Sequence, residues 1–307
     1  MNITKRSIYN KGLSKKNFLK NFRNEYIGRG LSTVCGMLIV FLTLSIIFFV
    51  ALKGISIFSK GYSLKEFLFS TNWSPDSDIP KFGALNFIAG SIFVSIGAVI
   101  LSAPISIALA IFINYISPKL GEKVLKPALE LFVGIPSVVY GWLGISILLP
   151  IIKKFFGGTG FSVLAGIVVL SIMILPTIAS IAVDAIKVIP KSYLQASYGL
   201  GATRWQTISK VIVPSAKNGI LTGIILGLAR AFGEALAVQM VIGNSVKFPN
   251  KLLNPASTIT GVITMDMSNT IQGTTWNDAL WALAFLLLIM SFLFIIVIRI
   301  IGRRRED

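Results

Sequence analysis

The chain of 307 residues contains no histidine, a single cysteine and only 13% charged side chains. Without histidine the commonest general base is missing, and Ser-His-Asp or Cys-His catalysis is excluded. The lone Cys35 excludes an internal disulfide. Because nitrogen and sulfur ligands are so scarce, a zinc or haem site is not expected. The sequence therefore predicts no bound metal and no cofactor.

Apolar residues, by contrast, make up 54% of the chain, and its mean hydropathy is +0.79. The charge that remains is uneven, with 29 Lys and Arg against 12 Asp and Glu, a net charge of +17. Low charge, high hydropathy and a basic excess indicate an integral membrane protein with basic loops. A nucleic-acid-binding protein would be polar as well as basic, so no nucleic-acid partner is expected.

Apolar segments predict an all-α fold with six transmembrane helices, since about 20 residues cross the hydrocarbon core. The first segment follows a basic region too long for a signal peptide, so we expect a retained span. Pro104 is expected to tilt or kink the second span. Segment 252–268 is too short and polar to span, which favours a surface-lying or re-entrant helix. The six segments are 31–52, 84–116, 124–150, 161–183, 218–243 and 279–301.

The loop charges predict the orientation. With the N-terminus inside, the inner segments carry 20 Lys and Arg and the outer segments carry 8, as the positive-inside rule requires. Both termini are then cytoplasmic. The basic arm is expected to set this topology, with binding to anionic membrane lipid as a second role. The predicted organisation is a basic arm at 1–30, a first transmembrane helix at 31–52, an extracytoplasmic loop at 53–83, a transmembrane domain at 84–302 and a basic tail at 303–307.

The inner loop between the fourth and fifth spans, residues 184–217, is long and patterned. Pro190 can open a helix over 192–198, Gly201 suits a tight turn, and 202–210 can form a second short helix. The pattern predicts two short helices joined by a glycine turn on the cytoplasmic face. The alternative is a single surface helix lying on the lipid headgroups.

This loop resembles the signature loop of binding-protein-dependent ABC permeases, in which Glu-Ala-Ala is followed by three residues, Gly, nine residues and an apolar-x-apolar-Pro sequence. The counterpart of the family's Glu is a Gln here. In that family the loop inserts into an ATP-hydrolysing subunit, and the resemblance implies the same coupling for this chain. The coupling residues would be Gln195, Ala196, Ser197, Gly201, Ala202 and Pro214.

The chain has no G-x-x-x-x-G-K sequence followed by Ser or Thr, the loop that cradles nucleotide phosphates. We therefore expect a transport subunit and not an enzyme, with ATP hydrolysis on a partner chain. A stand-alone secondary transporter is less favoured, because a carrier of that kind has no ATPase to dock on the inner loop.

Two further segments resemble the phosphate-specific permease subunits PstC and PstA. Residues 129–141 are LELFVGIPSVVYG and residues 222–238 are TGIILGLARAFGEALAV. The stretch 73–85 and the segment around Thr258 are more similar to PstC. The resemblance implies a type I ABC importer fold in a bacterial or archaeal plasma membrane. It also implies a PstA-like second permease subunit, a PstB-like ATPase dimer and a PstS-like extracytoplasmic phosphate-binding protein. A PstA-like role or another oxyanion remain alternatives.

Arg230 lies 12 residues into the fifth span, about 18 Å from its inner end and so near mid-membrane. A guanidinium at that depth needs a partner or a passing anion, and its planar fork matches two oxygens of phosphate. Glu234, four residues on, is expected on the same helical face as the partner of Arg230. The alternative is an Arg–Glu pair that only stabilises the helix packing.

An interruption is expected in the third span at residues 134–137. Pro136 removes a helical N–H group, and broken spans are tolerated where they line a cavity. Freed amides and the Ser137 hydroxyl are suitable donors to an anion, so Pro136 and Ser137 join Arg230 and Glu234 as candidate pathway residues. A packing kink is the alternative. Glu130, on the inner half of this span, is expected to pair with a basic residue of a neighbouring subunit.

Overall fold

The computed structural model describes residues 28–303, so most of the basic arm and of the basic tail lie outside the described residues. The chain divides into two units, residues 1–52 and residues 53–307. Helix α2 (Gly28–Ser59) begins in the first unit and ends in the second, and it is longer than the expected span.

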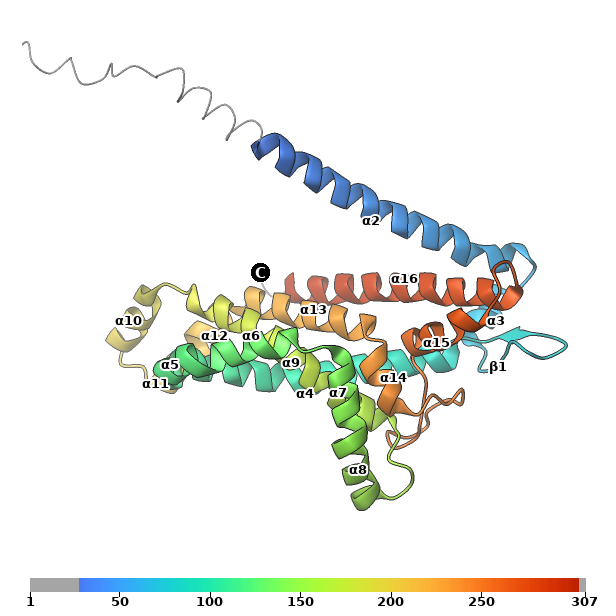
Figure 1. Ribbon diagram of the computed structural model, residues 1–307. Coiled ribbons are helices and arrows are strands. Elements are labelled where there is room, and N and C mark those ends of the chain that lie inside the picture. Colours follow the sequence, from blue (N-terminus) through green and yellow to red (C-terminus); the bar gives the residue numbers. More distant parts are fainter. Residues whose placement is uncertain (1–27, 304–307) are drawn as a thin grey trace, which may run out of the picture. The chain divides into compact units, whose positions relative to one another are not determined.

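The second unit is mostly helical (Figure 1). A short hairpin adds two strands, β1 (Trp73–Ser74) and β2 (Lys81–Phe82), which pair antiparallel with Trp73 opposite Phe82. The helices in chain order are α3 (Leu64–Phe69), α4 (Leu85–Ile111), η2 (Phe112–Ile116), α5 (Pro118–Leu120), η3 (Gly121–Leu125), α6 (Lys126–Gly134), α7 (Ser137–Leu143), η4 (Gly144–Leu148), α8 (Leu149–Phe156), α9 (Val163–Lys187), α10 (Lys191–Gly199), α11 (Arg204–Thr207), η5 (Ile208–Ile212), α12 (Val213–Ser215), α13 (Lys217–Gly233), α14 (Leu236–Ile242), α15 (Ile259–Asp266), η6 (Met267–Asn269) and α16 (Thr275–Arg303).

Within residues 28–303, five helices are long and apolar enough to cross a membrane: Gly28–Ser59, Leu85–Ile116, Ser137–Phe156, Val163–Lys187 and Thr275–Ile300. A sixth is counted if Arg204–Ser215 and Lys217–Gly233, which meet at 66°, form one span. The expected multi-span helical fold is thus confirmed. Two spans differ from expectation in their bounds, because the apolar segments 124–150 and 218–243 are each divided into shorter helices.

Helix α9 forms the centre of the second unit and packs against α4, α13, α6 and α14. Its side chains Leu170, Met173, Ile174 and Ile178 are fully buried. Glycines on the neighbouring helices allow this close approach, since a Cβ at Gly227 of α13 would lie 2.5 Å from Ile178. Small residues at helix contacts are typical of membrane proteins, where van der Waals packing drives association.

Pro104 does not end α4, which runs unbroken from Leu85 to Ile111. One buried polar side chain of α4 and one half-buried polar side chain of η2 fasten the two helices to α9 beyond that point. The Ser106 hydroxyl donates to the Leu175 carbonyl at 3.0 Å, and the Asn114 amide donates to the Val183 carbonyl at 3.1 Å. The expectation of one span through Pro104 is therefore confirmed.

Candidate functional site

The interruption expected in the third apolar segment is present. Helix α6 ends at Gly134, Pro136 is extended at φ −58° and ψ 138°, and α7 begins at Ser137. Because Pro136 has no N–H group, a carbonyl of α6 loses its helical donor. The Tyr140 hydroxyl of α7 reaches back and donates to the Phe132 carbonyl at 2.9 Å. Pro136 is exposed and Ser137 is half-buried.

A second interruption divides the fifth apolar segment, where no proline predicts it. Helix α13 ends at Gly233, Glu234 is extended at φ −75° and ψ 125°, and α14 begins at Leu236. The Glu234 amide donates to the Ala231 carbonyl at 3.3 Å, and its oxygens accept two further hydrogen bonds. Its Oε1 accepts from the Ala237 amide at 2.9 Å, and its backbone carbonyl accepts from the Thr260 hydroxyl at 2.8 Å.

The expected Arg230–Glu234 pair on one helical face is wrong, because the helix ends between the two residues. Within residues 28–303 they form no ion pair. The Glu234 carboxylate instead caps the first turn of α14, whose amides have no helical partners. Arg230 is half-buried, and its Nη1 donates to the Thr177 hydroxyl of α9 at 2.9 Å.

Helix α15 lies against this second interruption. It falls inside segment 252–268, where a surface-lying or re-entrant helix was expected, but its first turn is buried. The Ile259 amide donates to the Ser91 hydroxyl of α4 at 2.9 Å, and the Thr258 and Thr260 hydroxyls lie 3.1 Å apart. Thr260 is a site residue that sequence reasoning missed, because only the fold brings it to Glu234.

The two interruptions occur in neighbouring helices. The halves that follow them, α7 and α14, lie side by side (Figure 1). They meet at glycine, since a Cβ at Gly141 would lie 2.6 Å from Met240 Sδ. The fold therefore brings together α7 and α14, the halves that follow the two interruptions.

The inner loop forms two short helices joined by a glycine turn, as predicted. Gly201, at φ +80°, follows α10 in the left-handed conformation that glycine adopts at little cost. The Gly201 amide donates to the Tyr198 carbonyl at 2.9 Å, and the Ala202 amide donates to the Ser197 carbonyl at 3.2 Å. These are the two bonds of a Schellman motif, so the turn is fully specified by the local sequence.

The second helix of the loop begins with a capping box. The Thr203 hydroxyl accepts from the Gln206 amide, and the Gln206 side chain accepts from the Thr203 amide. The Ser197 hydroxyl lies 2.9 Å from that of Thr207, which is fully buried. Thr207, which sequence reasoning also missed, therefore joins the two helices. It precedes the continuous run of η5 and α12.

The outer face of this loop is exposed and partly apolar. Leu200 and Trp205 are 89% and 64% exposed, and Gln195, Ala196 and Pro214 are exposed as well. The Arg204 guanidinium donates to the Tyr115 carbonyl at the end of η2. Exposed aromatic and apolar side chains on a rigid surface element are typical of protein–protein contacts.

An ion pair joins the end of α9 to η3. Lys187 Nζ lies 2.8 Å from Glu122 Oε1, and this contact lowers the pKa of the Glu122 carboxyl. Glu130, expected to meet a neighbouring subunit, is exposed on α6. Among residues 28–303 no group of three or more His, Cys, Asp or Glu side chains is placed to hold a metal ion.

Comparisons with known proteins place these features among membrane permeases. Residues 104–307 match the family described as "Binding-protein-dependent transport system inner membrane component". The chain is 50% identical over 285 residues to the "Probable ABC transporter permease protein YqgH" of Bacillus subtilis, with 92% of each chain covered. It is 32% identical over 255 residues to the "Phosphate transport system permease protein PstC" of Xylella fastidiosa, with 76% of this chain and 78% of the relative covered.

A solved structure shares the fold. The crystal structure of a bacterial ABC transporter involved in the import of the acidic polysaccharide alginate aligns with 95% of this chain and 100% of its own. The TM-score is 0.62 and the sequence identity is 17%. At that identity the likeness concerns the fold alone.

Proposed function

The chain belongs to the family of binding-protein-dependent transport system inner membrane components, and from this membership we propose that it is the PstC-like permease subunit of an ATP-driven phosphate importer. Members of the family are multi-pass permease subunits of ABC importers in the prokaryotic plasma membrane, working with ATPase and substrate-binding partners. The chain is thus a transport subunit rather than an enzyme. The proposal adds phosphate as the substrate, supported by the 32% identity to a PstC protein.

The choice of an anion as the transported substrate rests on the surroundings of Arg230. The residue is half-buried in an apolar helix, and within residues 28–303 one hydroxyl, that of Thr177, is the hydrogen-bond partner of its guanidinium. A cation that lies among apolar side chains is stabilised when an anion or another partner neutralises its charge. Because four of its five N–H donors remain for other acceptors, the guanidinium can bind two oxygens of a phosphate ion.

The interruptions supply the rest of the proposed pathway. Pro136 keeps α7 separate from α6, which leaves Ser137 at the amino end of α7, where its hydroxyl can donate to an anion. Glu234 contributes by fixing the start of α14 rather than by pairing with Arg230. The phosphate would pass between these helices and those of a PstA-like second permease chain.

The inner loop is the proposed contact with a PstB-like ATPase dimer, through Gln195, Ala196, Ser197, Gly201, Ala202 and Pro214. The glycine turn gives this assignment a direct test. Gly201→Val forces a β-branched residue to φ +80°. We expect the variant to reach the membrane and to lose co-purification with the ATPase. Unchanged assembly and unchanged substrate-stimulated ATP hydrolysis would contradict the assignment.

The substrate is tested by uptake of radiolabelled phosphate in cells that lack their own importer and express this chain with its permease, ATPase and PstS-like partners. We expect uptake that needs all four components and resists excess sulfate. A protonated phosphate can donate a hydrogen bond that sulfate cannot. Sulfate-sensitive uptake, or transport of another oxyanion only, would overturn phosphate as the substrate and leave the family assignment intact.

A further inference from the structure

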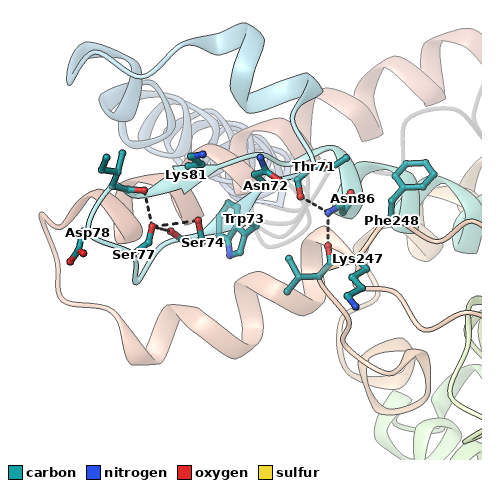
Figure 2. A pocket seen from close by; sticks show the side chains of 12 residues that line it. Thr71, Asn72, Trp73, Ser74, Ser77, Asp78, Lys81, Asn86, Lys247 and Phe248 are labelled. Atoms are coloured by element: carbon teal, nitrogen blue, oxygen red, sulfur yellow. Dashed lines mark hydrogen bonds between the residues drawn. The ribbon is translucent and has the colours of Figure 1, made fainter.

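A cleft of about 890 Å³ opens between two segments that are far apart in the sequence. One wall is the hairpin of β1 and β2 with its tip, and the other is formed by residues 246–248, after α14 (Figure 2). We call this the outer cleft. Its volume is in the range that holds ligands of many atoms and is far larger than one oxyanion needs.

Asn86, in the first turn of α4, joins the two walls. The residue is 2% exposed, and its side-chain amide donates to the Thr71 carbonyl at 2.7 Å and to the Val246 carbonyl. Figure 2 shows this amide between the two segments at one end of the cleft. Both acceptors are main-chain groups, so the side chain fixes the backbone of each wall. The hairpin is held further by Trp73, whose ring lies 5.1 Å from that of Phe87.

The hairpin that lines the cleft lies at the opposite end of α4 from the inner loop helices α10 and α11 (Figure 1). Helix α4 and η2 together run 32 residues, Leu85–Ile116, which corresponds to about 48 Å at 1.5 Å per residue. The far end of η2 accepts the Arg204 hydrogen bond of the inner loop. If the inner loop meets an ATPase in the cytoplasm, as proposed above, the outer cleft faces the extracytoplasmic side.

The cleft combines positive charge with exposed apolar side chains. Lys81 lines one wall and Lys247 the other, both exposed, against one lining carboxylate, Asp78. Ile79 and Val246 are 77% and 41% exposed. The other hairpin carboxylate, Asp76, acts on Asp266 of α15, where burial and then this charge raise the pKa of the Asp266 carboxyl. Exposed apolar side chains with flanking charge mark a protein-docking surface.

We propose that the outer cleft receives an acidic and apolar loop of the extracytoplasmic substrate-binding protein, with Lys81 and Lys247 as its charge contacts and Asn86 as the residue that holds the walls in place. The inference rests on the proposed function for the side of the membrane and for the partner. It does not depend on phosphate as the substrate. The two lysines, one on each wall, also favour a partner that fills the cleft over one that touches a single rim.

The test uses the complete transporter in nanodiscs and the purified substrate-binding protein that its host produces with it. Lys81→Glu and Lys247→Glu place like charges against the loop, and we expect each to weaken binding about tenfold and the double variant more. The wild-type affinity should fall with added salt, and that of the double variant much less. Lys65→Glu is the matched control, since Lys65 is exposed on α3 outside the cleft, and its binding should stay within about twofold of wild type.

Asn86 is tested separately. Asn86→Asp removes both donors and sets a carboxylate against two carbonyls, and we expect a loss of affinity at least as large as that of one lysine variant. Wild-type affinity of the double lysine variant would overturn the proposal even if Asn86→Asp fails to assemble. The proposal would also be overturned if the wild-type transporter binds inorganic phosphate or anionic lipid at the cleft, the lysine changes abolish that binding, and affinity for the binding protein stays unchanged. If the wild-type complex binds a binding protein for another anion and the lysine variants lose it, the docking surface stands and only phosphate fails.

Discussion

The two interrupted helices reach similar shapes by different means. Between α6 and α7 the break contains Pro136, and the Phe132 carbonyl that loses its helical donor accepts from the Tyr140 hydroxyl, eight residues on, and from the Ile135 amide. Between α13 and α14 no proline is present, and the carbonyl of Glu234 is satisfied by Thr260, 26 residues away on α15. The first break is thus a local property of the chain. The second depends on a distant segment being in place.

This difference distinguishes a break that depends on the local sequence from a break that depends on a tertiary contact. Pro136 removes a helical N–H group whatever its tertiary contacts, although a proline alone need not end a helix, since α4 runs unbroken through Pro104. A break held by a distant hydroxyl exists only while that contact exists. The second break also follows Arg230 within one turn, so we expect changes there to affect transport more than changes at the first.

The largest effect is expected for Arg230→Gln, because the helix before the first break carries an exposed carboxylate, Glu130, and no basic residue in its last turn. Uptake of labelled phosphate should fall about tenfold to a hundredfold, the loss that corresponds to a charge-assisted hydrogen bond. Arg230→Lys should restore part of it, since an ammonium lacks the planar fork. Assembly of the complex serves as the control, and wild-type uptake by Arg230→Gln would reduce the residue to a packing role.

Thr260→Val should come next, because it leaves the Glu234 carbonyl without its donor. We expect a cost of about 1 to 3 kcal/mol, measured as lower thermal stability and faster hydrogen exchange of the α14 amides. Thr260→Ser keeps the hydroxyl and should restore slow exchange. Thr264→Val is the matched control, since the Thr264 hydroxyl donates within α15 to the Thr260 carbonyl. Equal exchange in Thr260→Val and wild type would mean that α15 does not hold the second break.

Glu234→Ala should cost about 1 kcal/mol, the usual value of a helix cap. Glu234→Gln should cost less, because an amide oxygen can still accept from the Ala237 amide. Thermal unfolding of the assembled complex measures both, and uptake should follow the same order. A larger loss for Gln than for Ala would show that the charge matters beyond the cap, which would return Glu234 to the role of partner of Arg230.

Tyr140→Phe should have the smallest effect, about 1 kcal/mol or less, since Pro136 keeps the break open without the hydroxyl. Spin labels at the exposed positions Leu131 and Trp142, placed in a Cys35→Ser background, should report the same distance with and without the hydroxyl. A changed distance would show that the first break also depends on a side-chain contact, and the contrast between the two breaks would disappear.

Much of the fold could be predicted from the sequence, because its signals are local. Apolar segments of about 20 residues, Pro136 within one of them, and the glycine turn at Gly201 each act over a few residues. The Arg230–Glu234 pair was predicted by the same local reasoning and was wrong. Helical spacing says which residues share a face only if the helix continues, and Gly233 before Glu234 does not by itself show that α13 ends.

The sequence by itself therefore determined the membrane class, the number of apolar segments, the first break and the helix–turn–helix of the inner loop. Tertiary structure alone decided the second break, the partners of Arg230 and Glu234, and the outer cleft. The physical reason is the same in all three cases. The Thr177 and Thr260 hydroxyls and the Asn86 amide satisfy groups that lie 15 to 160 residues away along the chain, and only packing brings such groups within hydrogen-bond distance.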